Sequence, residues 1–381
     1  MRIGIDARFW GTEHTGIGRY VMELVSCLEK IDRENEYLIF LRKKYFNQLN
    51  FTNSNFKKRL ADIPHYSFAE QISFTKVLHK ERLDLVHFPH FNIPILYRGK
   101  FVLTVHDLIK HQSKGPSTTT HSRFFYWLKF IAYLAVINIG LRRAQAIIVP
   151  SFWWQDRLKR KFGLSERRIK VIYEAVSQDF KKPIRSRNKK LIDQVLEKYQ
   201  IRSPFVIYTG NLYPHKNIIR LVEVIRMINQ KRTLFLVIVC GKSIFWRRFK
   251  KEIEETSASE FVFLTGFIPD KELTFLYQAA SAFVFPSLLE GFGLPGLEAM
   301  AVGLPVIASR ASCLPEIYQG AAYYFDPTSS DDIKTKILEV LENRKLRVEL
   351  IKKGYRRVKD FSWEKMAQET REIYQTVIKI K

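Results

Sequence analysis

Cysteine is scarce in this 381-residue chain. The three cysteines, Cys27, Cys240 and Cys313, lie far apart, and no pair has C-x-x-C spacing. This excludes a disulfide-stabilised secreted domain and gives no zinc or redox motif. Unpaired thiols in a long chain are typical of a reducing compartment, so we expect a cytoplasmic protein.

Long hydrophobic runs are also missing. The longest, residues 130–141, has twelve residues and includes Asn138. A membrane-spanning helix needs about 20 apolar residues. We therefore expect a soluble protein, or one that binds the inner face of the cell membrane peripherally. Residues 124–134 are apolar nearly all round a helix, which fits either a buried core helix or a helix partly inserted in a bilayer interface.

Acidic residues are few relative to basic ones. The chain has 38 Asp and Glu against 63 Lys and Arg, a formal net charge of +25. Hydrophobic residues make up 46% of it, which excludes global disorder. The excess charge favours an anionic partner: a membrane surface, a nucleic acid or small anionic molecules. No nucleic-acid recognition motif is present, so we expect no nucleic acid.

Short β-branched apolar runs alternate with helical patterns, as in parallel sheets covered by helices. Strands are predicted at 2–6, 37–41, 84–88, 101–106, 146–150 and 170–173, and then at 205–210, 234–241, 261–264, 282–286 and 306–308. The basic stretch 181–190 breaks the alternation and is predicted to be a linker. We therefore expect two doubly wound α/β domains, residues 1–182 and 190–361, facing across a ligand-binding cleft, with helix 362–381 packing back on the first.

The most informative motif is F-P-S-L-L-E-G-F-G-L-P-G-L-E-A-M at residues 285–300. It combines a strand end, a glycine-rich loop and a helix that starts near Pro295. Glycines allow close backbone approach to a ligand, and a helix start favours an anion. A plain strand-to-helix turn is the alternative.

With this motif, the sequence resembles the retaining, nucleotide-sugar-dependent glycosyltransferases of group 1 or family 4, which have the GT-B fold. Within that family it looks most like the bacterial mannosyltransferases that extend O-antigen and related surface polysaccharides. The resemblance implies a nucleotide-sugar donor, with GDP-mannose as the best guess, a glycan or lipid-linked acceptor, and no cofactor. Five further segments fit it: residues 16–20, 87–92, 104–107, 210–217 and 264–267.

The leaving diphosphate of such a donor needs positive charge around it. No Asp-x-Asp pair is present to hold a metal ion, so we expect a metal-independent enzyme in which Lys216 supplies the charge. The resemblance also assigns diphosphate binding to Lys216. The sequence departs from the commoner family pattern at Asn211, where an Arg is frequent, and we expect Arg19 or Arg220 to supply part of that charge.

The resemblance implies roles for the other site residues. Glu290 contacts the transferred sugar, Glu298 the ribose, and His106 the sugar, with Asp107 orienting it; a His106 general base and a structural histidine are alternatives. Catalytic roles are thus expected for Glu290, Lys216 and His106. Substrate binding is expected for Gly16, Gly18, Arg19, Asp107, Asn211, Gly266, Phe267, Ile268, Gly291, Phe292, Gly293, Leu294 and Glu298.

Three further interpretations are weaker. His87 and His90 are expected in an acceptor-side loop rather than as a metal pair, since no further ligand is near in sequence. Glu70 is expected to line the same cleft. A hydrolase pair of Glu290 and Glu298 is disfavoured, because eight helical steps span about 12 Å and glycosidases need about 5–9.5 Å. A nucleotide-sugar epimerase remains an alternative.

Overall fold

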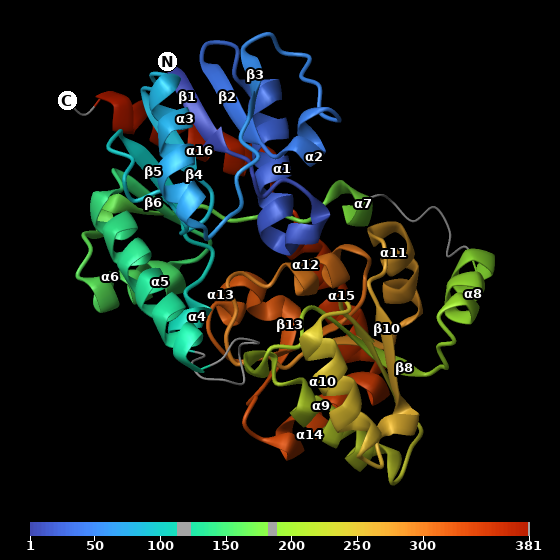
Figure 1. Ribbon diagram of the computed structural model, residues 1–381. Helices are drawn as coiled ribbons and strands as arrows, with labels where there is room; N and C mark the ends of the chain where they lie inside the picture. The colour runs from blue at the N-terminus through green and yellow to red at the C-terminus, as the bar shows by residue number, and fades with distance from the viewer. Residues whose placement is uncertain (113–122, 182–188, 380–381) are drawn as a thin grey trace. The chain divides into compact units, whose positions relative to one another are not determined.

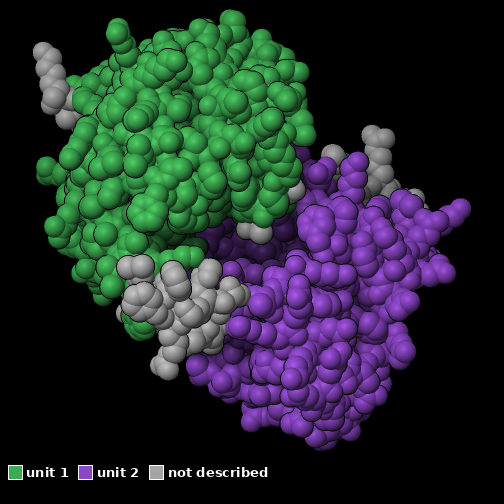
Figure 2. Space-filling view, in the orientation of Figure 1, with its two compact units in different colours: residues 1–108, 121–174, 362–381 green, residues 109–120, 175–361 purple. Residues whose placement is uncertain are grey.

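The computed structural model describes residues 1–112, 123–181 and 189–379 (Figure 1). The chain forms two compact units, coloured separately in Figure 2. Unit 1 comprises Met1–Leu108, His121–Glu174 and Ser362–Lys381, and unit 2 comprises Ile109–Thr120 and Ala175–Phe361. Unit 1 thus gives way to unit 2 after Glu174, ahead of the linker that we expected at residues 181–190.

Unit 1 is built on a seven-stranded parallel sheet of order β3-β2-β1-β4-β5-β6-β7. Its central strands are continuous apolar runs and are buried on both faces, because helices cover both sides of the sheet. The strands are β1 (Arg2–Asp6), β2 (Glu36–Leu41), β3 (Phe56–Leu60), β4 (Leu85–Phe88), β5 (Phe101–Thr104), β6 (Ala146–Val149) and β7 (Ile169–Val171).

The helices of unit 1 include one from the far end of the chain. α16 packs on α1, and Arg371 of α16 lies 3.3 Å from the buried Asp32 carboxylate. The helices are α1 (Thr15–Ile31), α2 (Lys43–Phe46), α3 (Thr75–Lys80), α5 (Arg123–Arg143), α6 (Phe152–Phe162) and α16 (Trp363–Lys379), with 3-10 turns at Thr12–His14 and Glu166–Arg168 and a π-helical segment at Glu70–Phe74.

Unit 2 repeats this plan with a six-stranded parallel sheet of order β10-β9-β8-β11-β12-β13. The strands are β8 (Phe205–Thr209), β9 (Phe235–Val239), β10 (Val262–Gly266), β11 (Ala282–Phe285), β12 (Val306–Ser309) and β13 (Ala322–Phe325). The helices are α4 (Ile109–Gln112), α7 (Gln178–Lys181), α8 (Lys189–Lys198), α9 (Ile218–Asn229), α10 (Ile244–Glu254), α11 (Asp270–Ala279), α12 (Leu294–Ala301), α13 (Leu314–Tyr318), α14 (Ser330–Glu342) and α15 (Arg344–Val358), with short turns at Pro214–Lys216, Ser259–Phe261 and Gln319–Ala321.

The prediction of two doubly wound α/β domains is confirmed. The strand order reverses between β1 and β4 in unit 1 and between β8 and β11 in unit 2. Ligands bind such sheets beyond the carboxyl ends of the strands at this switch point. Among the helices of the described residues, none has both the length and the apolar character needed to cross a bilayer.

The sequence did not predict β3, β13 or α8. β3 and β13 are edge strands, and the sequence of β3, F-K-K-R-L, has no apolar run because only its first residue, Phe56, is buried. α8 begins at Lys189, inside the stretch that we predicted to be a linker, and buries only Val195.

Candidate functional site

Lys216 and Glu290 meet at the switch point of unit 2. Lys216 ends the turn after β8, and Glu290 lies in the loop after β11, the neighbouring strand. The Lys216 Nζ lies 2.7 Å from each oxygen of the Glu290 carboxylate. Both side chains are largely buried, with exposed fractions of 11% and 8%. Two residues expected to act on a donor therefore form one ion pair.

Main-chain hydrogen bonds fix the two loops that present this pair. The Leu288 N–H donates to the His215 carbonyl oxygen at 2.8 Å, which ties one loop to the other. The Asn217 side-chain amide donates to the carbonyl oxygens of Pro286 at 3.2 Å and Pro327 at 2.8 Å. The Glu290 N–H donates to Ser312 Oγ at 3.1 Å. The backbone around the pair is thus held from several sides.

The loop that follows Glu290 needs its glycines. Gly293 has φ +97° and caps the N-terminus of α12, and the Tyr318 hydroxyl donates to its carbonyl oxygen at 2.6 Å. A Cβ on Gly293 or Gly296 would lie 2.6 or 2.3 Å from that hydroxyl oxygen, which no real contact allows. Tyr318 therefore packs where only glycine fits, and the first turn of α12 begins at Leu294 beside Glu290.

The remaining predicted residues of unit 2 lie at the same edge of its sheet. Glu298 is buried in α12. Gly266 ends β10 with φ +79°, Phe267 is 66% exposed and Ile268 is buried. Asn211 follows β8 and is exposed. Phe292 and Leu294 are buried.

Two buried polar atoms beside the ion pair are unpartnered within residues 1–112, 123–181 and 189–379. They are Ser287 Oγ and His215 Nδ1. Burial lowers the pKa of His215 to about 3, so its imidazole is neutral. A buried polar group without a hydrogen bond is costly, and a bound ligand would remove that cost. These atoms favour a polar ligand at this switch point.

In unit 1, the predicted substrate-binding residues Gly16 and Gly18 lie in the first turn of α1. A Cβ on Gly18 would lie 1.9 Å from the carbonyl oxygen of Gly11, which has φ +121°. Gly18 is therefore required for the close contact between α1 and the loop after β1. Gly16 has nothing within 4 Å of a Cβ position, so packing does not require glycine there. Arg19 follows in the same turn of α1.

His106 follows β5 and is held by two acceptors. Its Nδ1 lies 2.8 Å from Glu174 Oε1, and its Nε2 lies 3.0 Å from the Pro89 carbonyl oxygen. Burial acts to lower the pKa of His106, but the hydrogen bond and charge of Glu174 outweigh it and raise that pKa. The carboxylate that contacts the His106 ring is therefore that of Glu174, which the sequence did not indicate. Asp107, which we expected to orient His106, attracts the ring electrostatically. Glu174 follows β7 at the same edge of the sheet as His106, and this position in the sequence could have indicated it.

Our interpretation of His87 as an acceptor-side loop residue is wrong. It lies inside β4, fully buried, with Nδ1 2.6 Å from the Tyr374 hydroxyl and Nε2 2.7 Å from Thr104 Oγ1. Burial lowers its pKa to about 3. His87 is a neutral core residue that links β4 to β5 and to α16. His90 is also buried, with Nδ1 accepting from the Asn92 N–H at 3.2 Å.

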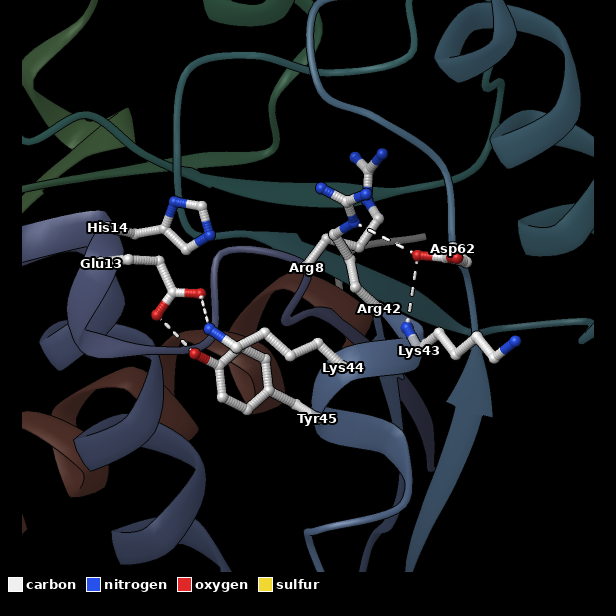
Figure 3. Close-up of a pocket in the computed structure, with 8 residues that line it drawn as sticks. All are labelled: Arg8, Glu13, His14, Arg42, Lys43, Lys44, Tyr45 and Asp62. Atoms are coloured by element: carbon white, nitrogen blue, oxygen red, sulfur yellow. Dashed lines mark hydrogen bonds and ion pairs between the residues drawn. The ribbon is translucent and has the colours of Figure 1, made fainter.

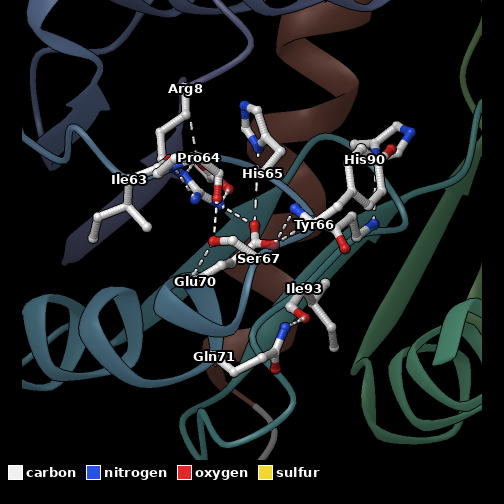
Figure 4. A network of polar contacts seen from close by, with 12 residues as sticks. Arg8, Ile63, Pro64, His65, Tyr66, Ser67, Glu70, Gln71, His90 and Ile93 are labelled. Atoms are coloured by element: carbon white, nitrogen blue, oxygen red, sulfur yellow. Dashed lines mark hydrogen bonds and ion pairs between the residues drawn. The ribbon is translucent and has the colours of Figure 1, made fainter. Parts of the chain in front are cut away.

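Glu70 does not line an open surface either. It is fully buried and accepts from Arg8 Nη2 at 2.6 Å, from Asn92 Nδ2 at 2.7 Å and from the Tyr66 N–H at 2.8 Å (Figure 4). Arg8 in turn donates to both carboxylate oxygens of Asp6, each at 2.8 Å. A buried arginine between two carboxylates thus ties the loops after β1, β3 and β4 together.

A cavity of about 450 Å³ lies beside that arginine in unit 1 (Figure 3). Several of its charges are paired, with Lys44 Nζ 2.6 Å from Glu13 and Arg42 Nε 3.3 Å from Asp62. Its volume is in the range of small-molecule sites, about 300–1,000 Å³. The sequence did not indicate it, because its walls come from the loops after three different strands. The lining residues are Arg8, Glu13, His14, Arg42, Lys43, Lys44, Tyr45 and Asp62.

Nowhere in the described parts of the chain do three or more His, Cys, Asp or Glu side chains gather in a way that could hold a metal ion. The three cysteines are all buried free thiols.

Two family models match this chain, one on each unit. The model described as glycosyltransferase family 4 matches residues 14–180, and that described as glycosyl transferases group 1 matches residues 192–357. Together they include every strand of the two sheets except β1, and they include Lys216, Glu290 and His106.

Individual proteins of known name are also similar. The chain is 29% identical to the O-antigen chain mannosyltransferase B of Escherichia coli, over 94% of this chain and 96% of that protein. It is 24% identical to the O-antigen chain mannosyltransferase RfbU of Salmonella typhimurium, over 85% and 86% of the two chains. Among solved structures, a sucrose-phosphate synthase from Thermosynechococcus elongatus superposes over 100% of both chains with a TM-score of 0.79 at 20% identity. That likeness shows the same fold.

Proposed function

Since the chain belongs to the group 1 and family 4 glycosyltransferases, we propose that it transfers mannose from GDP-mannose, without a metal ion, to a polysaccharide or lipid-linked glycan. The bacterial relatives at 29% and 24% identity, both named as O-antigen chain mannosyltransferases, support the sugar and the acceptor class. The observation that carries the donor site is the buried pair of Lys216 and Glu290 at the switch point of unit 2.

We propose that Lys216 binds the donor diphosphate. An ammonium group has three N–H donors, so one remains for a phosphate oxygen while two contact Glu290. A cation about 4 Å from the diphosphate contributes about 4 kcal/mol at an effective dielectric of about 20. The start of α12 adds roughly 0.3–2 kcal/mol. Lys216 is therefore the main source of stabilisation for the leaving group, and the absence of any Asp-x-Asp sequence supports metal independence.

We assign Glu290 to the hydroxyls of the transferred sugar and Glu298 to the ribose. Backbone N–H groups between Gly291 and Leu294 hold the sugar, and residues 266–268 contact the base edge. The fixed loop after β11 and the unpartnered Ser287 Oγ support a polar ligand here. Gly16, Gly18 and Arg19 are assigned to donor phosphates or acceptor, and Asn211 and Asp107 to the donor.

The transfer is proposed to retain the anomeric configuration. The acceptor oxygen bonds to the anomeric carbon from the face that the diphosphate leaves, and a diphosphate oxygen takes the acceptor proton. The sequence offers no paired carboxylates for a covalent glycosyl-enzyme. Analysis of the product anomer by NMR tests this, and an inverted product would overturn it.

We propose that unit 1 binds the acceptor. Its cavity beside Arg8 offers both donors and acceptors, from Lys44, Arg42, Glu13 and Asp62, as vicinal sugar hydroxyls require. Replacing Tyr45, whose hydroxyl donates to Glu13, by Phe should raise the KM for acceptor and leave that for donor unchanged. An unchanged acceptor KM would count against the cavity.

An anionic membrane surface is proposed as a further partner, with the protein at the inner face of the cell membrane. On α5, Phe130, Tyr133 and Ile137 are buried, whereas Trp127 and Ile131 are 52% and 62% exposed, one helical turn apart. An exposed aromatic and aliphatic stripe with basic neighbours is typical of interfacial helices. Co-sedimentation with anionic vesicles, compared with Trp127→Ser, tests this.

A panel of nucleotide sugars tests the donor. We expect GDP-mannose to raise the melting temperature more than UDP-sugars do and to be consumed only when an acceptor is present. A larger shift with UDP than with GDP would overturn the donor assignment. Consumption without acceptor would indicate an epimerase instead, and steeply salt-dependent nucleic-acid binding with no response to sugars would indicate the non-enzymatic alternative.

A further inference from the structure

We propose that Glu174 is a positioning residue that holds His106 as a doubly protonated imidazolium, which ties three loops of unit 1 and does not act as a general base. The inference deepens the proposed function and rests on it for its effect on turnover. Its structural part concerns unit 1 alone and can be tested without any substrate.

The hydrogen-bond partners of His106 set its protonation state. Nε2 lies 3.0 Å from the Pro89 carbonyl oxygen, which can only accept a hydrogen bond. Nδ1 lies 2.8 Å from the Glu174 carboxylate, which accepts when ionised. A neutral imidazole has one N–H and can satisfy only one of these partners. When Glu174 is ionised, the two acceptors on one ring therefore require both nitrogens to be protonated.

The alternative arrangement is a neutral imidazole beside a protonated Glu174. The negative charge of Asp107 beside the ring stabilises a positive imidazolium and does not stabilise a neutral imidazole. Both side chains are nearly buried, with exposed fractions of 12% and 7%, so each charge needs the other. Burial alone would favour the neutral pair, but the hydrogen bond to Glu174 and the nearby negative charges outweigh it and raise the pKa of His106.

The groups around His106 are consistent with a positive ring. Asp107 follows it in the chain and attracts it. Tyr20 of α1 packs its ring edge-to-face at 4.7 Å, and burial raises the pKa of that phenol, so it is neutral. His87 of β4 is neutral because burial lowers its pKa to about 3.

The His106 ring connects three loops through its hydrogen bonds to Glu174 and Pro89. Pro89 follows β4, His106 follows β5 and Glu174 follows β7, and all three positions lie at the carboxyl edge of one sheet. Loss of one proton would leave a nitrogen lone pair facing an oxygen and release one of the loops. The bond to Glu174 is thus the reason that the edge keeps its shape at neutral pH.

Long-range proton–nitrogen NMR of the wild-type protein measures the protonation state directly. We expect both His106 nitrogens to be protonated at pH 7.5, because the Glu174 carboxylate holds the pKa of the imidazole above its ordinary value. A neutral His106 at pH 7.5 would overturn the proposal. This readout needs no variant and no substrate, so it separates the proposal from the donor and acceptor assignments.

The variant Glu174→Gln tests the positioning role. A neutral amide gives less support to the imidazolium, so the descending limb of kcat against pH should move down by about 1 unit or more, with activity recovered at low pH. Glu166→Gln is the matched control, because Glu166 is exposed and pairs with Lys159. An unmoved pH profile in Glu174→Gln would contradict the positioning role; Glu174→Asp, which keeps the charge, should stay close to wild type.

Discussion

The Lys216 ammonium and the Glu290 carboxylate, 74 residues apart, form a buried ion pair with both oxygens 2.7 Å from Nζ. The strands that precede them are neighbours at the point where the strand order of unit 2 reverses. The pair is neutral as a whole, so a diphosphate that binds here shares the ammonium with Glu290. The hydrogen bonds within the pair therefore determine how many donors of Lys216 and acceptors of Glu290 are left for a ligand.

Breaking this pair should cost stability as well as activity. Lys216→Met removes the cation that neutralises the buried Glu290 carboxylate, which destabilises by about 3–5 kcal/mol. The double variant Lys216→Met with Glu290→Gln should regain most of that stability and none of the activity. Urea unfolding and turnover measure the two effects. As a control, Glu342→Gln, which removes an exposed partner of Arg232, should change stability by less than about 1 kcal/mol. A Lys216 variant with full activity would contradict the site.

Gly293→Ala should weaken donor binding through the backbone. The residue has φ +97°, and a Cβ would lie 2.6 Å from the Tyr318 hydroxyl oxygen. A strained residue of this kind costs roughly 1–3 kcal/mol. Gly241→Ala is the control, since nothing lies within 4 Å of its Cβ position. Calorimetric titration with donor and thermal melting should both respond in Gly293→Ala, and a normal donor affinity would show that the loop is not part of the site.

Alanine variants of Gly16 and Gly18 should distinguish a loss of ligand contact from a loss of packing. Gly18→Ala places a Cβ 1.9 Å from the Gly11 carbonyl oxygen, so the melting temperature should fall by several degrees. Gly16→Ala meets no atom within 4 Å and should melt like the wild type. If Gly16 contacts substrate as proposed, this second variant loses turnover at unchanged stability. Full activity in Gly16→Ala would remove Gly16 from the site.

The buried histidine His87 should make the protein sensitive to acid. Its pKa is about 3 in the fold and about 6.5 in the unfolded chain, so the unfolded state binds an extra proton as pH falls below 6.5. The stability that depends on a neutral His87 is therefore fully present above pH 6.5 and is lost progressively as the pH falls toward 3. Between pH 7.5 and 5, this residue accounts for a loss of about 2 kcal/mol. Urea melts of His87→Gln should show that much less loss; an equal loss in both proteins would contradict the assignment.

Sequence patterns predicted those structural features that are determined by residues close together in the chain. The apolar runs predicted the central strands, and the motif around Gly293 predicted the turn into α12, because such signals lie within a few residues. The sequence could not show that Lys216 bonds to Glu290, that Glu174 holds His106 across 68 residues, or that Arg8 lies between Asp6 and Glu70. These pairings depend on which strands become neighbours. The edge strand β3 was missed because half-exposed strands lack the apolar run.

The proposed function requires that a nucleotide-sugar diphosphate binds at Lys216 and Glu290 of unit 2. Isothermal titration of GDP-mannose into the wild type and into the well-folded double variant of Lys216→Met with Glu290→Gln tests it most directly, in buffer with a metal chelator. We predict clear binding to the wild type and an affinity at least about 30-fold weaker for the variant, about 2 kcal/mol. Equal affinity for both proteins, or no binding to the wild type without a metal ion, would contradict the claim.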